Sequence, residues 1–120
     1  MDRRVLEVMH LLESCSASLP LRDPSRDLAR SVALSASRLR HIFKRETGVT
    51  PAQFLGQKKL EQARELLETS HLSVKEVAAQ VGIPNQSHFV RVFKKAYGLP
   101  PGRYGRGSVE TKWRFHPASK

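Results

Sequence analysis

The sequence predicts an all-α protein, in which two subdomains of paired short helices are joined by a long connecting helix, with about seven helices in total. Apolar side chains recur at helical spacing along most of the 120 residues. Two short helices separated by a tight turn occur twice, about 50 residues apart. No segment alternates between apolar and polar residues for long enough to predict a β-strand.

The first predicted helix covers residues 2–17, where four apolar residues recur at helical spacing: Val5, Val8, Met9 and Leu12. The two prolines of "SLPLRDPS" end it. A second helix is expected to begin near Asp23 or Pro24, with Pro24 suited to the first helical position, and to run through "SRDLARSV".

A short turn at residues 33–35 leads into the third helix. Ser35 can cap that helix by accepting a hydrogen bond from a free backbone N–H group. The helix is expected to continue to Thr47 and to stop at Gly48, which readily adopts a left-handed conformation.

The connecting helix is predicted over residues 51–69, with Thr50 as its cap and Pro51 as its first residue. Its inward side is formed by apolar residues: Phe54, Leu60, Ala63, Leu66 and Leu67.

Two further helices follow the connecting helix. Ser73 and Glu76 have the spacing of a capping box for "SVKEVAAQV". After the turn "GIPN", the last main helix is expected to begin near Asn85 or Gln86 and to end at Gly98. "LPPGRY" then predicts one more short helical turn.

These elements divide the chain into four segments. The first subdomain takes residues 1–50, the connecting helix 51–69, the second subdomain 70–105, and a tail 106–120. The tail has weak structural signals and is expected to be disordered, with Trp113 and Phe115 available to pack back onto the domain.

The internal repeat indicates a helix-turn-helix motif in each subdomain. At an offset of 50 the following pairs match: Leu39 and Phe89, Phe43 and Phe93, Gly48 and Gly98, Pro51 and Pro101, Phe54 and Tyr104. Before the turns the offset is 49, so the second turn is one residue longer. In a helix-turn-helix motif the second helix can enter the DNA major groove, which predicts reading helices over residues 36–47 and 86–97.

Each reading helix has an apolar stripe opposite a basic one. The inward stripes are Leu39, Ile42 and Phe43 in the first helix, and Phe89, Val92, Phe93 and Ala96 in the second. Arginine can hydrogen-bond guanine bidentately and glutamine can do so to adenine, while lysine pairs with phosphate. The candidate base contacts are Ser37, Arg40, His41, Gln86, Ser87, Val90 and Arg91, with Val90 suited to a thymine methyl group. The candidate phosphate contacts are Lys44, Arg45, Lys94 and Lys95, together with Arg38 and His88, which fit either role.

The charge of the chain supports a polyanionic partner. The net charge is +10, and residues 77–109 contain no Asp or Glu. Double-stranded DNA is the favoured ligand, and non-specific binding of RNA or DNA is the alternative. Single-strand binders usually expose aromatic rings, whereas Phe43, Phe89 and Phe93 fall on the inward stripes.

An enzyme is not expected. His41 and His88 lie in basic surroundings without an acid placed to orient them, so no catalytic residue is predicted. The single cysteine, Cys15, and the scattered histidines give no metal-ligand spacing, and no glycine-rich nucleotide motif indicates a cofactor. The lone cysteine and the lack of a signal peptide or a membrane-spanning run are consistent with the cytoplasm.

Residues 3–105 closely resemble the DNA-binding domain of AraC-type (AraC/XylS) bacterial transcription regulators. The resemblance rests on "SRLRHIFKRETGVTPAQFL" and on "VKEVAAQVGIPNQSHFVRVFKKAYGLPPGRY", which carries the long signature of the second repeat. The sequence departs from the usual pattern at five positions: Ala33 for Gly, Lys59 for Arg, Ile83 for Phe, Asn85 for Asp and Gly105 for Arg.

The resemblance implies a regulator whose two reading helices enter successive major-groove segments of a promoter or operator. It also implies activation of transcription through RNA polymerase, although some relatives repress. Most relatives carry a separate effector-binding or dimerisation domain, so the chain is either a stand-alone regulator or the DNA-binding part of a longer one.

Overall fold

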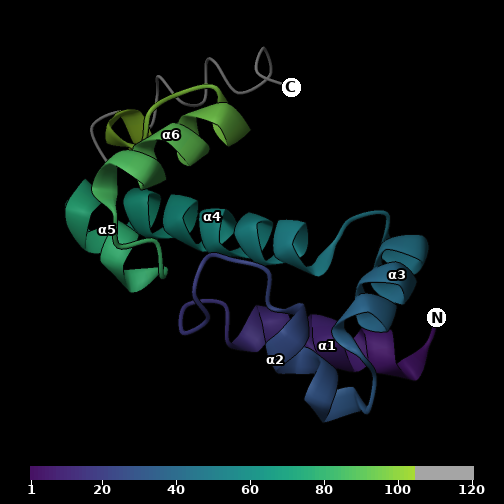
Figure 1. The fold of residues 1–120 in the computed structure, drawn as a ribbon. Helices are drawn as coiled ribbons and strands as arrows, with labels where there is room; N and C mark the ends of the chain where they lie inside the picture. Colours follow the sequence, from purple (N-terminus) through teal and green to yellow (C-terminus); the bar gives the residue numbers. More distant parts are fainter. Residues whose placement is uncertain (105–120) are drawn as a thin grey trace. The chain divides into compact units, whose positions relative to one another are not determined.

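The computed structural model describes residues 1–104, and this part of the chain is helical with no β-strand, which confirms the all-α prediction (Figure 1). The predicted tail lies outside the described residues. No helix in residues 1–104 is long and apolar enough to span a bilayer. The six α-helices and two 3-10 helices are α1 (Arg3–Ser14), α2 (Ser25–Ala29), η1 (Arg30–Val32), α3 (Ala36–Thr47), α4 (Pro51–Thr69), α5 (Val74–Gln80), α6 (Gln86–Tyr97) and η2 (Pro101–Tyr104).

The predicted caps of the helices are confirmed. Ser35 Oγ accepts from the backbone N–H of Arg38 at 3.1 Å, and α3 ends at Gly48 with φ of 87°. Ser73 and Glu76 form the reciprocal capping box of α5. The residues that begin and end α6 are likewise the predicted ones, with Asn85 as the N-cap and Gly98 as the C-cap.

Two predicted helix ends were wrong. α1 stops at Ser14 instead of residue 17, and a turn follows in which the N–H groups of Ser18 and Leu19 both donate to the Cys15 carbonyl. α2 begins at Ser25, and Pro24 is its N-cap instead of its first residue. Neither difference moves the segments that follow.

The chain separates into two compact units, residues 1–59 and residues 60 onward. In the first unit, α3 packs against α1 and α2 around an apolar cluster. The rings of Phe43 and Phe54 meet edge to face, with centroids 5.6 Å apart. Other buried apolar side chains of this unit include Val5, Val8, Leu12, Leu28, Val32, Leu39, Ile42 and Leu55.

The second unit repeats this packing around α6, which contacts α5 and η2. The rings of Phe93 and Tyr104 meet edge to face at 5.2 Å, and these residues follow Phe43 and Phe54 by 50 positions. The repeat seen in the sequence is therefore a repeat of aromatic contacts, each of which fixes a reading helix to the segment behind it.

Among the described residues, Lys59 is the charged exception to the apolar interior, and its side chain is fully buried in α4. Ser16 and Ser25 are buried polar residues. The Lys59 ammonium donates hydrogen bonds to the backbone carbonyls of Ser16 and Leu19. Burial lowers the pKa of Lys59 below its ordinary value. This side chain ties the loop after α1 to α4 in the first unit.

Candidate nucleic-acid interface

The turns that precede α3 and α6 differ in length but share one left-handed residue and one hydrogen bond. Ala33 (φ 56°) and Gly82 (φ 84°) both adopt the left-handed conformation. In each turn the next residue donates its N–H group back to a carbonyl five positions earlier, from Leu34 to Ala29 at 3.1 Å and from Ile83 to Ala78 at 2.9 Å. Each of the two repeats thus contains a helix-turn-helix motif, whose second helix is α3 in the first repeat and α6 in the second.

The face of α3 that points away from the core carries all the residues of this helix that were predicted to contact DNA. Leu39, Ile42 and Phe43 are buried as expected. The opposite side chains are exposed: Ser37, Arg38, Arg40, His41, Lys44 and Arg45. The first reading helix therefore presents hydrogen-bond donors and positive charge to solvent without losing its anchor.

The corresponding face of α6 is exposed at Gln86, Ser87, Arg91, Lys94 and Lys95. Val90 and His88 are only half-buried, so they remain partly accessible. The predicted inward stripe was wrong at one position: Ala96 is exposed, because the packing turns towards Tyr97 in the last turn of the helix. Val92 is half-buried, and Phe89 and Phe93 are fully buried.

Two of the predicted base-contacting arginines have side-chain partners. Arg40 Nη1 lies 3.1 Å from Asp23 Oδ2, in an ion pair between residues 17 positions apart. Arg91 Nη2 lies 3.1 Å from His88 Nδ1 within α6. The contact of Asp23 with Arg40 could not be predicted, because nothing in the local sequence pattern indicates that the loop before α2 reaches α3.

The basic residues also gather at the ends of the reading helices. Lys44 and Arg45 occupy the last turn of α3, and Lys94 and Lys95 the last turn of α6. Positive side chains there interact favourably with the helix dipole. A hollow of about 390 Å³ in the first unit is lined by Arg40, His41, Lys44, Arg45 and Thr50. This concave, cationic surface suits a phosphate backbone.

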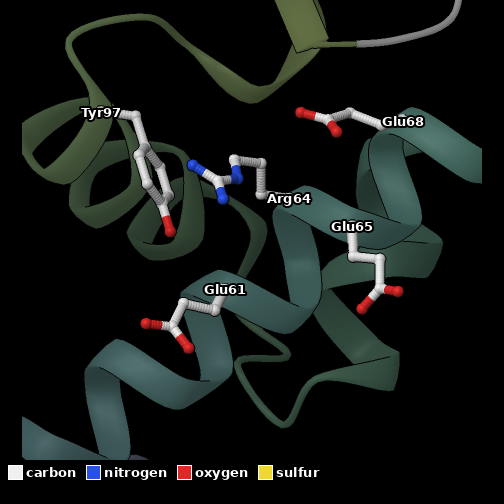
Figure 2. Close-up of a pocket in the computed structure, with 5 residues that line it drawn as sticks. All are labelled: Glu61, Arg64, Glu65, Glu68 and Tyr97. Atoms are coloured by element: carbon white, nitrogen blue, oxygen red, sulfur yellow. The ribbon is translucent and has the colours of Figure 1, made fainter.

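A second hollow, of about 410 Å³, lies in the second unit between α4 and the end of α6 (Figure 2). Figure 2 shows the Arg64 guanidinium beside the ring of Tyr97, and its carbon Cζ is 5.1 Å from the ring centroid. The remaining lining residues are acidic: Glu61, Glu65 and Glu68. Burial raises the pKa of the Tyr97 hydroxyl. Carboxylates repel phosphate, so this side of the second unit does not suit DNA.

No group of His, Cys, Asp and Glu side chains within residues 1–104 could hold a metal ion. The candidate site consists of the exposed faces of α3 in the first unit and of α6 in the second. The helix-turn-helix domain family matches residues 28–107, which is most of the chain. The chain belongs to the AraC-type helix-turn-helix family. The AraC-type regulators that it resembles include the arabinose operon regulatory protein of Escherichia coli (strain K12), which is 33% identical over 113 residues, 92% of this chain and 37% of that protein.

Solved AraC-type domains have the same fold. The C-terminal domain of AraT, a response regulator from Geobacillus stearothermophilus, aligns with a TM-score of 0.80 and 26% identity, covering 88% of this chain and 86% of that one. The DNA-binding domain of AdpA, a global transcriptional factor solved in complex with a target DNA, aligns with a TM-score of 0.76 and 27% identity, covering 94% and 96%.

The chain spans about a third or less of the length of the curated AraC-type relatives that it matches, 37% and 28% of two arabinose operon regulatory proteins and 26% of the xylose operon regulatory protein. These relatives are transcription regulators and not enzymes.

Proposed function

We propose that the protein is a sequence-specific transcription regulator of double-stranded DNA, with α3 and α6 in successive major-groove segments. The proposal rests chiefly on one observation: two helix-turn-helix motifs, each with a left-handed residue in its turn, bury an apolar stripe of the second helix and expose a basic one. A DNA complex of a relative with the same fold supports the ligand class. Residues 1–50 and 70–105 are then two subdomains joined by the helix 51–69.

The predicted contacts divide by their position along the helix. Ser37, Arg40 and His41 in α3, and Gln86, Ser87, Val90 and Arg91 in α6, would contact bases, because the N-terminal half of a recognition helix lies deepest in the groove. The phosphate contacts would be Arg38, Lys44, Arg45, His88, Lys94 and Lys95. If these and a few partners neutralise roughly 6–8 phosphates, log affinity falls with log salt at a slope of about −5 to −7.

Selection of bound sequences from a random duplex library tests the proposal. The expected result is a motif of two short boxes about one helical turn, ~34 Å, apart. Arg91→Ala should weaken binding by about 1–3 kcal/mol and relax one base position, whereas Lys95→Ala should weaken all sequences equally and reduce the salt slope by about 1. The two variants lose the same charge from the same helix, so each controls for the other. Equal binding of selected and scrambled duplexes would refute sequence specificity.

Non-specific nucleic-acid binding is the competing function. The phenylalanine rings at positions 43, 54, 89 and 93 are all buried, and no Phe, Tyr or Trp in residues 1–104 is exposed. Without an exposed ring, that part of the chain offers no stacking platform for single strands. A competition assay with single-stranded RNA separates the two functions, since effective competition would favour the non-specific one.

Activation through RNA polymerase is a further part of the proposal, as is an effector-binding or dimerisation domain that acts with this one. In vitro transcription from a promoter bearing the selected motif tests the first. An increase in transcript on adding the protein supports activation, and a decrease indicates repression.

A further inference from the structure

Arg40 differs from the other candidate DNA contacts in having an acid as its partner. Among the described residues, it is the one member of that set that forms an ion pair with a carboxylate. The acid is Asp23, which lies in the loop before α2. Both side chains are 44% exposed, so the pair lies at the surface that would face DNA.

Asp23 is itself held in place by the backbone. Its Oδ1 atom accepts a hydrogen bond from the backbone N–H of Ser25 at 3.0 Å, which leaves Oδ2 to accept from Arg40 Nη1 at 3.1 Å. Burial disfavours the charged carboxylate, but the hydrogen bonds from Ser25 and the charge of Arg40 outweigh it, so the pKa of Asp23 lies below its ordinary value. The carboxylate is therefore a fixed, ionised acceptor.

The contact engages only one of the three guanidinium nitrogens of Arg40. Nε and Nη2 keep donors on one edge, and two parallel donors are what guanine O6 and N7 accept. A free arginine side chain loses rotamer entropy when it is fixed in one orientation. A side chain that is already oriented loses less of it on binding.

The same carboxylate acts against binding to the wrong sequence. A negative charge beside the DNA surface repels phosphate, which weakens attraction to every duplex. At a correct base, the bidentate contact of Arg40 offsets that repulsion. Discrimination therefore gains from a preoriented contact and from weaker background binding.

We propose that Asp23 is a specificity-determining positioning residue of the first helix-turn-helix, holding Arg40 in the orientation that reads a base. This inference rests on the proposed function, since it assigns a role within base recognition. Asp23 itself touches Arg40, and its effect on DNA sequence preference passes through that side chain.

The test compares Asp23→Asn with Asp27→Asn. Asparagine at position 23 keeps an oxygen for the Ser25 N–H group, so the start of α2 is preserved while the ion pair is lost. Asp27 pairs with Arg22 at 3.4 Å, and its replacement removes the same charge from the same region without touching Arg40. Affinities are measured for a selected duplex and for one changed at the base whose preference Arg40→Ala relaxes.

Asp23→Asn is expected to lower the ratio of the two affinities by about 3–10-fold, as for the loss of roughly 1 kcal/mol of oriented contact. Asp27→Asn should raise background binding slightly and leave the ratio unchanged. In the Arg40→Ala background, Asp23→Asn should have no further effect on the ratio, which separates positioning from a structural role. An unchanged ratio in Asp23→Asn, or an equal fall in both backgrounds, overturns the inference.

A measurement without DNA distinguishes failure of this inference from failure of the proposed function. By carboxyl NMR titration, Arg40→Ala should raise the pKa of Asp23, and an unchanged pKa would show that the pair does not form and overturn the inference alone. If the wild-type protein binds selected and scrambled duplexes equally, the proposed function falls, and this inference falls with it.

Discussion

Replacing Lys59 with methionine isolates the contribution of the buried ammonium to the first unit. The substitution keeps an unbranched chain of similar length but removes the donor to the carbonyls of Ser16 and Leu19. A buried acceptor left without a partner costs about 1–3 kcal/mol, so two cost about 2–6. Methionine carries no charge, so the variant also avoids the desolvation penalty of the buried ammonium, which offsets part of that loss of stability. We therefore expect Lys59→Met to lower the free energy of unfolding by about 2–4 kcal/mol.

Urea unfolding gives the total change, and amide hydrogen exchange locates it. In Lys59→Met, protection of backbone amides from hydrogen exchange should decrease more in α1 than in α6, because the lost hydrogen bonds hold the loop that follows α1. Lys58→Met is the matched control: this neighbour is partly exposed, pairs with Glu13 at 3.5 Å and lies over Phe54, contacts worth about 1 kcal/mol in total. If Lys59→Met were as stable as the wild type, the argument from orphaned carbonyls would be refuted.

The pH dependence of the same variant follows from the lowered pKa of Lys59. As pH rises, the folded protein releases this proton before the unfolded chain does, so the unfolded state holds more protons across that interval. Wild-type stability should therefore rise relative to Lys59→Met between the folded pKa and the ordinary lysine pKa. Unfolding measured across that alkaline range should show the stability difference between wild type and Lys59→Met widening as pH rises, and parallel curves would contradict the assignment.

Three smaller predictions concern the helix ends. Ala33→Gly should raise the free energy of unfolding by about 1 kcal/mol, because Ala33 has a left-handed φ of 56°; a lower midpoint in urea would contradict this. Ser73→Ala should lower that free energy by about 1 kcal/mol through loss of the cap of α5, and a change within error would argue against it. The side-chain hydrogen bond from Arg4 lowers the pKa of Asp2 to about 2. The stability that the Asp2 carboxylate contributes is therefore fully present above its unfolded pKa, and it is lost as pH falls through about 2. NMR titration of Asp2 in wild type and Arg4→Ala checks this, with the higher pKa expected in the variant.

Helix starts and stops proved to be local properties of the sequence. Ser35, Ser73 and Asn85 cap the residues that follow them, and Gly48 and Gly98 end α3 and α6, because each acts on backbone groups within a few positions. The buried and exposed faces of the reading helices follow in the same way from helical periodicity. Ala96 is an exception to this periodicity: it is exposed, because the ring of Tyr97 packs against Phe93 in the last turn of α6.

The sequence by itself determined the helices, their order, the repeat and the basic faces, since each depends on spacing along the chain. Only the tertiary structure decided which distant groups meet. Lys59 reaches carbonyls about 40 residues away, and Asp23 reaches Arg40 across 17 residues. Such contacts depend on how a loop folds back, which no local pattern encodes. The candidate DNA contacts could therefore be predicted from the sequence, whereas the contact between Asp23 and Arg40 could not.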